Sequence, residues 1–270
     1  MKPAAFFFDL DGTLVDTETP WTLAIAAFLA DRGVSAPVAE LAPLVCGRSW
    51  YDIHAQLHRR YGALPPADPA TDAKALRPYY DRVVTDPKSV VIPSSVAFLR
   101  KVASFAPVAI VSGSPRADVW DLARTCDVAF QLQFVLGTED YTRGKPAPDC
   151  FLKAASMLEV DASECVVVED STAGVRAGRA AGMQVLALNR NRLVPQDFTG
   201  ATWLVGDLSE IDVNEVFDPS GLRYHVGRVK DAAESRIQGL TVQVGKVKDA
   251  AETRLHEHLQ DLTKWTTSRR

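Results

Sequence analysis

Short apolar runs alternate with amphipathic segments over most of this chain. Runs without regular polar interruptions are typical of strands buried on both faces of a parallel sheet. Several of the helix-length segments between them begin with proline, a residue favoured in the first turn of a helix. The alternation indicates right-handed βαβ units and an α/β fold with helices on both faces of the sheet. The predicted strands are residues 6–8, 108–112, 134–136, 165–169, 184–188 and 202–205, and the predicted helices are residues 93–104, 115–125, 148–158 and 172–181.

Residues 17–89 follow a different pattern, because they contain no strand-like alternation. An apolar stripe runs from Trp21 to Leu29 at helical spacing. We therefore predict an all-helical cap domain that is inserted after the first strand of the α/β core. Further helices are expected around residues 38–45, 49–61 and 71–85. The predicted domains are the core at residues 1–15 and 90–217, the cap at 16–89 and a separate C-terminal segment at 218–270.

The C-terminal segment contains an internal repeat, because residues 226–236 closely resemble residues 244–254. The 18-residue period equals five helical turns, so both copies present the same face. Residues 226–262 therefore form one amphipathic stripe, which predicts a helical extension. A helix pair packed on the core, a coiled coil, and an interaction or membrane-surface arm all fit this pattern. The mixed charges of the polar face argue against a membrane surface, so we favour homo-oligomerisation or docking of a partner.

The net charge of −4 is unevenly distributed along the chain. Residues 221–270 contain ten Lys and Arg against six Asp and Glu, so they carry +4 and the preceding residues carry −8. An acidic body does not suggest a protein that binds nucleic acid. The segment that we assign to association therefore carries a net positive charge, whereas the rest of the chain carries a net negative charge.

The cysteines indicate a reducing compartment, and the apolar runs are too short for a membrane span. Four widely spaced cysteines form no CxxC pair, which favours free thiols over a metal site or disulfides. No apolar run approaches the roughly 20 residues that span a bilayer. The chain enters its first strand without the pattern of a secretory signal. We therefore expect a cytoplasmic protein without a transmembrane segment.

The first strand ends in two carboxylates, Asp9 and Asp11. Open α/β sheets bind ligands at the carboxyl ends of their strands. Two like charges this close repel each other unless a cation or a shared proton compensates them, and Mg²⁺ prefers such oxygen ligands. The alternative is a simple turn, in which Asp11-Gly12 only makes the bend.

Three further elements place reactive groups at the same predicted edge: Ser112-Gly113, Lys145 and Glu169-Asp170. Each has an ordinary alternative, since Ser112 could cap a helix, Lys145 could be a solvated loop residue, and the acidic pair could face a helix N-terminus. Together they provide a carboxylate nucleophile, metal ligands and groups that hold phosphoryl oxygens. The set therefore predicts a phosphoryl-transfer site.

These four motifs, in this order, resemble the haloacid dehalogenase superfamily over residues 1 to about 215. The resemblance is to the branch with a helical cap, which includes β-phosphoglucomutase-like enzymes and sugar-phosphate phosphatases. It implies a Rossmann-like parallel-sheet core. It also implies that Asp9 is the nucleophile and a Mg²⁺ ligand, and that Asp11 is the general acid and base whose carbonyl also binds Mg²⁺. Glu169 and Asp170 would complete the metal site.

The resemblance also implies which groups bind the transferring phosphoryl group. Ser112 and the backbone of Gly113 would hold it, Lys145 would neutralise its charge and that of the nucleophile, and Thr13 would support the loop. β-Phosphoglucomutases carry a histidine twelve residues after the nucleophile, where this chain has Trp21. We therefore predict a Mg²⁺-dependent phosphatase acting on a small phosphorylated metabolite, with a sugar phosphate favoured. A phosphosugar mutase and a catalytically silent binding module are the alternatives.

The cap supplies candidates for contacts with the substrate, each of which could equally serve cap packing or solvation. They are Glu18, Trp21, Arg48 and Trp50. The cap also contains His54 and His58, whose i, i+4 spacing on a helix can hold zinc. Because no third ligand is apparent in the sequence, we expect these two histidines to lie on a solvated helix face.

Overall fold

The computed structural model describes residues 3–46, 48, 50–62, 68–190 and 194–213. All of these residues belong to the first of the two units, residues 1–222 and 223–270, into which the chain divides. The 18-residue repeat lies outside the described residues. The association assigned to it therefore stays a prediction, as do the predicted domain limits.

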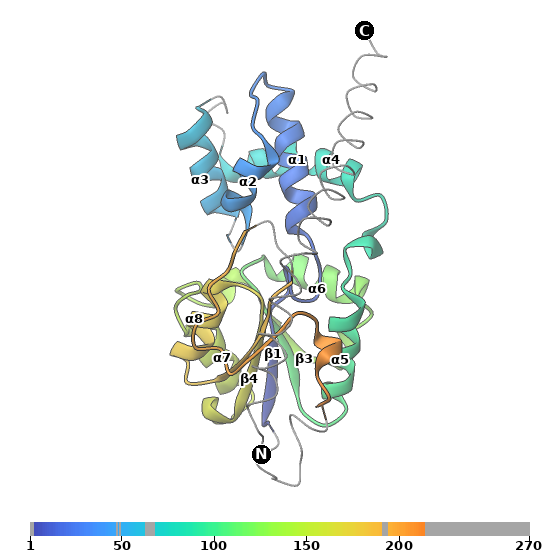
Figure 1. Ribbon diagram of the computed structural model, residues 1–270, viewed down its shortest axis with the longest axis vertical. Coiled ribbons are helices and arrows are strands. Elements are labelled where there is room, and N and C mark those ends of the chain that lie inside the picture. The colour runs from blue at the N-terminus through green and yellow to red at the C-terminus, as the bar shows by residue number, and fades with distance from the viewer. Residues whose placement is uncertain (1–2, 47, 49, 63–67, 191–193, 214–270) are drawn as a thin grey trace, which may run out of the picture. The chain divides into compact units, whose positions relative to one another are not determined.

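Within the described residues, a parallel sheet runs in the order β3-β2-β1-β4-β5-β6 (Figure 1). Because every neighbouring pair is parallel, the carboxyl ends of all strands lie along the same edge. The chain leaves β1 towards β2 and β3, and then returns to the other side of β1 with β4. The strands are β1 (Ala5–Phe8), β2 (Val108–Val111), β3 (Leu132–Leu136), β4 (Cys165–Glu169), β5 (Gln184–Leu188) and β6 (Trp203–Val205).

Helices cover both faces of the sheet, which explains why the strands are apolar throughout. Phe6 and Phe8 pack with α5 and α6 on one face, whereas Phe7 packs with α7 and α8 on the other. All three phenylalanines are fully buried. The helices are α5 (Pro93–Ala103), α6 (Arg116–Thr125), α7 (Asp149–Met157) and α8 (Thr172–Ala180), and the short 3-10 turns are η1 (Pro87–Val90), η2 (Ala129–Gln131), η3 (Thr138–Asp140), η4 (Ala162–Glu164) and η5 (Leu208–Glu210).

The segment between β1 and η1 is a helical insert with its own hydrophobic core. Its last helix begins at Pro69, two residues earlier than predicted, because Asp68 caps it: the Asp68 carboxylate accepts hydrogen bonds from the amides of Ala70 and Thr71. The predicted α/β fold with a helical insert is therefore confirmed. The helices of the insert are α1 (Glu18–Ala30), α2 (Val38–Val45), α3 (Trp50–Tyr61) and α4 (Pro69–Val83).

The cysteines are free thiols, as predicted. Cys126, Cys150 and Cys165 are buried and Cys46 is half-buried. Among the described residues, no helix has the length and apolar character needed to cross a membrane.

Candidate active site

The predicted catalytic groups meet at the carboxyl edge of the sheet, around β1. Asp9 and Asp11 follow β1, Ser112 follows β2, and Glu169 ends β4. Strands β2 and β4 flank β1, so the chain reverses its order of strands at this point, which is where open α/β sheets bind ligands.

Lys145 joins the carboxylates of two different strands. Its Nζ donates to Asp9 Oδ1 and to Glu169 Oε1, both at 2.6 Å, and to the carbonyl oxygen of Val111 at 3.0 Å. These three acceptors match the three donors of an ammonium group. Burial by itself lowers the pKa of Lys145, but the two carboxylates outweigh it and hold the pKa above its usual range. Lys145 is therefore a fixed cation in the site, and the solvated-loop alternative is wrong.

Asp9 lies in a buried cluster that carries an excess of negative charge. Burial is the main cause that raises the pKa of Asp9 to about 8, with Glu169 and Asp11 raising it further and Lys145 lowering it. One oxygen each from Asp9, Glu169 and Asp170 lie within 4.8 Å of one another. Three buried carboxylates against one ammonium leave a net negative site. A set made only of hard oxygen donors fits a divalent cation such as Mg²⁺.

Asp11 has a different environment, although it lies only two residues from Asp9. Its Oδ2 accepts from Ser114 Oγ at 2.8 Å and from Ser112 Oγ at 3.4 Å, and its Oδ1 accepts from Thr17 Oγ1 at 2.5 Å. Hydroxyl groups can donate to a carboxylate and can also accept from a carboxylic acid. The Asp11 carboxylate is therefore surrounded by three hydroxyl groups.

Ser112 is buried at the end of β2, and it is not the cap of the following helix. Helix α6 begins with Pro115 at its N-cap and has no side-chain capping bond. Ser112 Oγ instead accepts from the amide of Ser114 at 3.0 Å, and the hydroxyl of Tyr141 donates to the Ser112 carbonyl oxygen at 2.8 Å. Gly113 is exposed at the same turn. The hydroxyl of Ser112 is therefore fixed beside Asp11.

Glu169 and Asp170 are both buried at the end of β4. Glu169 Oε2 accepts from the amides of Asp170 and Ser171 and from Ser171 Oγ, each at 2.9 Å. Thr13 Oγ1 donates to Asp170 Oδ1 at 3.1 Å, and the role expected of Thr13 stays a prediction. The N-cap of α8 is Ser171 rather than the acidic pair.

Sequence reasoning missed four residues that shape this site. Thr17 and Ser114 donate to Asp11, and Tyr141 donates to Ser112. Gly174 leaves room for Glu169, because a Cβ atom at Gly174 would lie 1.7 Å from Glu169 Oε1. The sequence offered one sign, a glycine in the first turn of a predicted helix, where it costs stability.

The four cap candidates occupy different environments. Trp21 stacks on Tyr80 at 4.1 Å between ring centroids, and Trp50 Nε1 donates to the carbonyl oxygen of Pro69 at 2.6 Å. Both contacts lie within the insert. Arg48 is exposed, and Glu18 is half-buried in the first turn of α1.

The expectation of a solvated face for both cap histidines is wrong. His54 is buried, because the first turn of α4 places Asp72 against it. Only His58 keeps a partly exposed side chain.

A model of the haloacid dehalogenase-like hydrolases matches residues 3–182, so the chain belongs to this family; its helical insert after β1 is that of the capped subfamily. A β-phosphoglucomutase from Mycobacterium bovis is 31% identical over 242 residues, which cover 78% of this chain and 92% of that protein. Hexitol phosphatase A from Escherichia coli is 31% identical over 201 residues, which cover 70% and 84% of the two proteins.

Similar solved structures include a HAD family hydrolase from Deinococcus radiodurans with bound phosphate and sodium. It has a TM-score of 0.61 and 27% identity, and the match covers 78% of this chain and 94% of that one. The chain spans only 28% and 21% of the length of two Arabidopsis thaliana proteins that it also matches. Members with different reactions therefore share this family and fold.

Proposed function

We propose that this member of the haloacid dehalogenase-like hydrolases is a Mg²⁺-dependent phosphatase of a small phosphorylated metabolite. The observation that carries the proposal is the difference between the surroundings of the two aspartates. Asp9 shares a buried cluster with Lys145 and Glu169, whereas Asp11 is surrounded by hydroxyl donors. The Lys145 ammonium lowers the pKa of Asp9, and bound Mg²⁺ would lower it further and so favour the ionised nucleophile, whereas hydroxyl groups around Asp11 suit the acid–base group.

In the first step, an oxygen of Asp9 attacks phosphorus, and the bond between phosphorus and the leaving oxygen breaks. Protonated Asp11 gives its proton to that oxygen. In the second step, Asp11 takes a proton from water while the water oxygen attacks the phosphorus of the aspartyl phosphate. Inorganic phosphate leaves and the Asp9 carboxylate is restored.

The remaining residues hold the phosphoryl group and its charge. Lys145 and the Ser112–Gly113 turn would bind the phosphoryl oxygens, since phosphoryl transfer depends mainly on positioning and charge stabilisation. The carboxylates of Asp9, Glu169 and Asp170, with the carbonyl of Asp11, would hold Mg²⁺. When bound, Mg²⁺ offsets negative charge on the carboxylates and on the phosphoryl oxygens.

A sugar phosphate is the proposed substrate class, and relatives named as a hexitol phosphatase and a β-phosphoglucomutase support it. Hydrolysis is favoured over isomerisation because Trp21 stands where the resemblance to mutases would require a histidine. The indole of Trp21 packs on Tyr80 and offers no titratable group. Contacts of Glu18, Trp21, Arg48 or Trp50 with the substrate, and a cytoplasmic location, stay predictions.

The test is phosphate release by the full chain from a panel of sugar phosphates that includes β-glucose 1-phosphate, with and without Mg²⁺. We expect Mg²⁺-dependent release that Asp9→Asn abolishes, because an amide cannot form the aspartyl phosphate. Phosphorus NMR of the same reactions detects a phosphate that moves within the sugar. Isomerised product without free phosphate would establish the mutase instead, and wild-type turnover by Asp9→Asn would refute the mechanism.

A further inference from the structure

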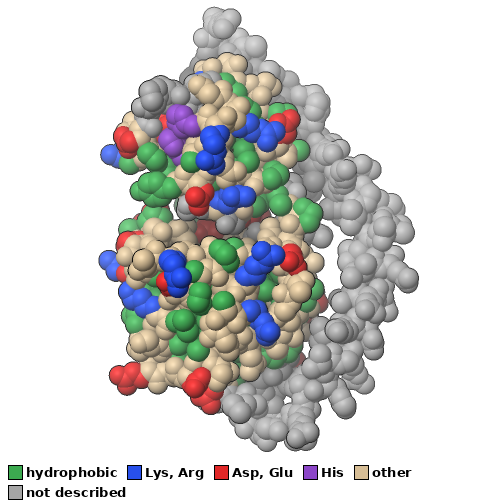
Figure 2. All heavy atoms as spheres, turned by 90° about the vertical axis from the view of Figure 1, so that its left-hand side faces the viewer, with side chains coloured by type: hydrophobic (Ala, Val, Ile, Leu, Met, Phe, Trp, Pro, Cys, Tyr) green, Lys and Arg blue, Asp and Glu red, His purple; other side chains and the backbone are tan. Residues whose placement is uncertain are grey.

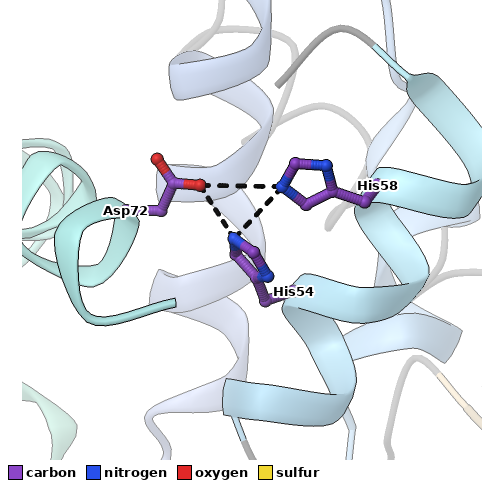
Figure 3. A group of neighbouring side chains, drawn as sticks. All are labelled: His54, His58 and Asp72. Atoms are coloured by element: carbon purple, nitrogen blue, oxygen red, sulfur yellow. Dashed lines mark hydrogen bonds and ion pairs between the residues drawn. The ribbon is translucent and has the colours of Figure 1, made fainter. Parts of the chain in front are cut away.

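Three side chains of the helical insert, none of them among the active-site residues described above, point at one another. They are His54 and His58 on α3 and Asp72 on α4 (Figure 3). His54 Nε2 lies 2.8 Å from Asp72 Oδ2 and 3.2 Å from His58 Nε2, and His58 Nε2 lies 3.8 Å from the same carboxylate oxygen. Two nitrogens and one oxygen therefore converge on one point.

We propose that these three side chains bind one zinc ion. Zinc takes tetrahedral nitrogen and oxygen ligands at about 2.0–2.2 Å, which places neighbouring ligand atoms about 3.3 Å apart. The observed separations of 2.8, 3.2 and 3.8 Å lie on both sides of this value. A point about 2 Å from all three atoms exists without any movement of the helices.

The helices hold the ligands independently of any ion. The i, i+4 spacing puts both histidines on one face of α3. Asp72 lies at the start of α4, where the carboxylate of Asp68 fixes the first turn through the amides of Ala70 and Thr71. The indole of Trp50 also ties the start of α3 to the carbonyl oxygen of Pro69.

Two of the three proposed ligands are buried, unlike polar side chains on an ordinary helix surface. The side chains of His54 and Asp72 are 8% and 5% exposed, whereas that of His58 is 27% exposed. Figure 2 shows histidine side chains at the surface of the molecule. An ion can therefore enter past His58, and water can occupy the fourth position of the tetrahedron.

The chemistry of the donors separates this site from the carboxylate cluster of Asp9. Imidazole nitrogens suit zinc and other transition metals, whereas a set made only of oxygen suits Mg²⁺. Without an ion, a single proton cannot satisfy two imidazole nitrogens that face each other and one carboxylate oxygen. One cation engages all three lone pairs at once and links α3 to α4.

The test is equilibrium dialysis of the full chain against Zn²⁺ in excess Mg²⁺, which occupies the carboxylate cluster. We expect one tightly bound Zn²⁺ per chain. Asp72→Asn and His58→Gln should each weaken binding by about 100-fold or more, because loss of outer partners alone costs roughly 10–100-fold. Asparagine has nearly the shape of aspartate and can still accept from His54. His225→Gln, His256→Gln and His258→Gln, combined in one protein, form the control, which removes the other histidines of the chain and should leave binding unchanged.

X-ray absorption at the zinc edge is measured on the control protein, because its helical insert is unchanged and His54 and His58 are its only remaining histidines. We expect scattering from two imidazole rings together with oxygen ligands. A zinc ion surrounded by oxygen alone would overturn the proposal. Absence of binding by the wild type, or binding that is lost in the control and kept in Asp72→Asn, would also overturn it.

Discussion

Gly174→Ala tests whether the position of Glu169 controls catalysis. The new methyl carbon would lie 1.7 Å from Glu169 Oε1, and side chains essentially never approach a Cβ atom closer than 3.0 Å. The carboxylate must therefore withdraw by at least 1.3 Å, the difference between these two distances. This movement breaks its 2.6 Å contact with Lys145 Nζ and disturbs the expected metal site.

The expected loss of activity follows from that displacement. A misplacement of about 1 Å in an active site can lower turnover roughly 100-fold, or about 2.7 kcal/mol in the activation barrier. Alanine is a better helix former than glycine by about 1 kcal/mol. This gain offsets part of the free energy of folding that the close contact with Glu169 removes. We therefore expect a large loss of kcat and a weakened response to Mg²⁺, together with a lower melting temperature, because the buried ion pair between Lys145 and Glu169 is also broken. Steady-state phosphate release over a range of Mg²⁺ concentrations and thermal unfolding measure the two effects.

Gly178→Ala is the matched control, because Gly178 lies on the same helix. Its Cβ atom would meet Val185 Cγ2 at 2.9 Å and Val167 Cβ at 3.3 Å, within the apolar core. Overpacking of this kind costs about 1–3 kcal/mol in stability, so the melting temperature should fall while kcat is kept. If Gly174→Ala retained wild-type turnover and Mg²⁺ response, the assigned role of Glu169 would be wrong.

Three further predictions concern the same site. Asp11→Asn should lower kcat/KM for a sugar phosphate by roughly 10²–10⁴-fold by removing the proton donor. Steady-state assays should show a smaller loss of kcat/KM with an aryl phosphate, whose leaving group needs less protonation, and an equal loss of kcat/KM on both substrates would contradict the role of general acid. Ser114→Ala removes the 2.8 Å hydrogen bond to Asp11. It should lower kcat roughly 10- to 150-fold in steady-state assays, since a hydrogen bond to a charged group is worth roughly 1.5–3 kcal/mol. Unchanged kinetics would show that Thr17 and Ser112 suffice. Chelation with EDTA should stop phosphate release and added Mg²⁺ should restore it; activity that persists after exhaustive chelation would refute the metal requirement.

The common location of the proposed catalytic groups at one edge of the sheet was predictable because it depends mainly on chain direction. In a parallel sheet every strand delivers its following residues to the same edge, so Asp9, Ser112 and Glu169 had to come together. Fully apolar strands implied helices on both faces, and the helical pattern of the insert was equally plain. These conclusions required periodicity and topology but no side-chain contact.

The supporting contacts were not predictable, because they depend on side-chain geometry between segments far apart in the sequence. Ser114 and Thr17 are ordinary hydroxyl residues until the fold directs both at the carboxylate of Asp11. The close approach of Gly174 to Glu169 requires the exact path of α8 past the end of β4. The sequence therefore predicted which proposed reacting groups lie together but not which residues contact them.

The cap histidines also show that contacts between segments far apart in the sequence cannot be predicted from pattern. His54 and His58 are neighbours on one helix, so their pairing was visible in the sequence, whereas Asp72 lies 18 residues beyond His54 and carries no pattern of its own. It reaches the pair because the start of α4 lies against α3. This contact between two helices depends on tertiary packing, which the pattern of either helix does not reveal. The donor sets of the two clusters then differ in kind, and excess Mg²⁺ in the dialysis experiment separates them for that reason.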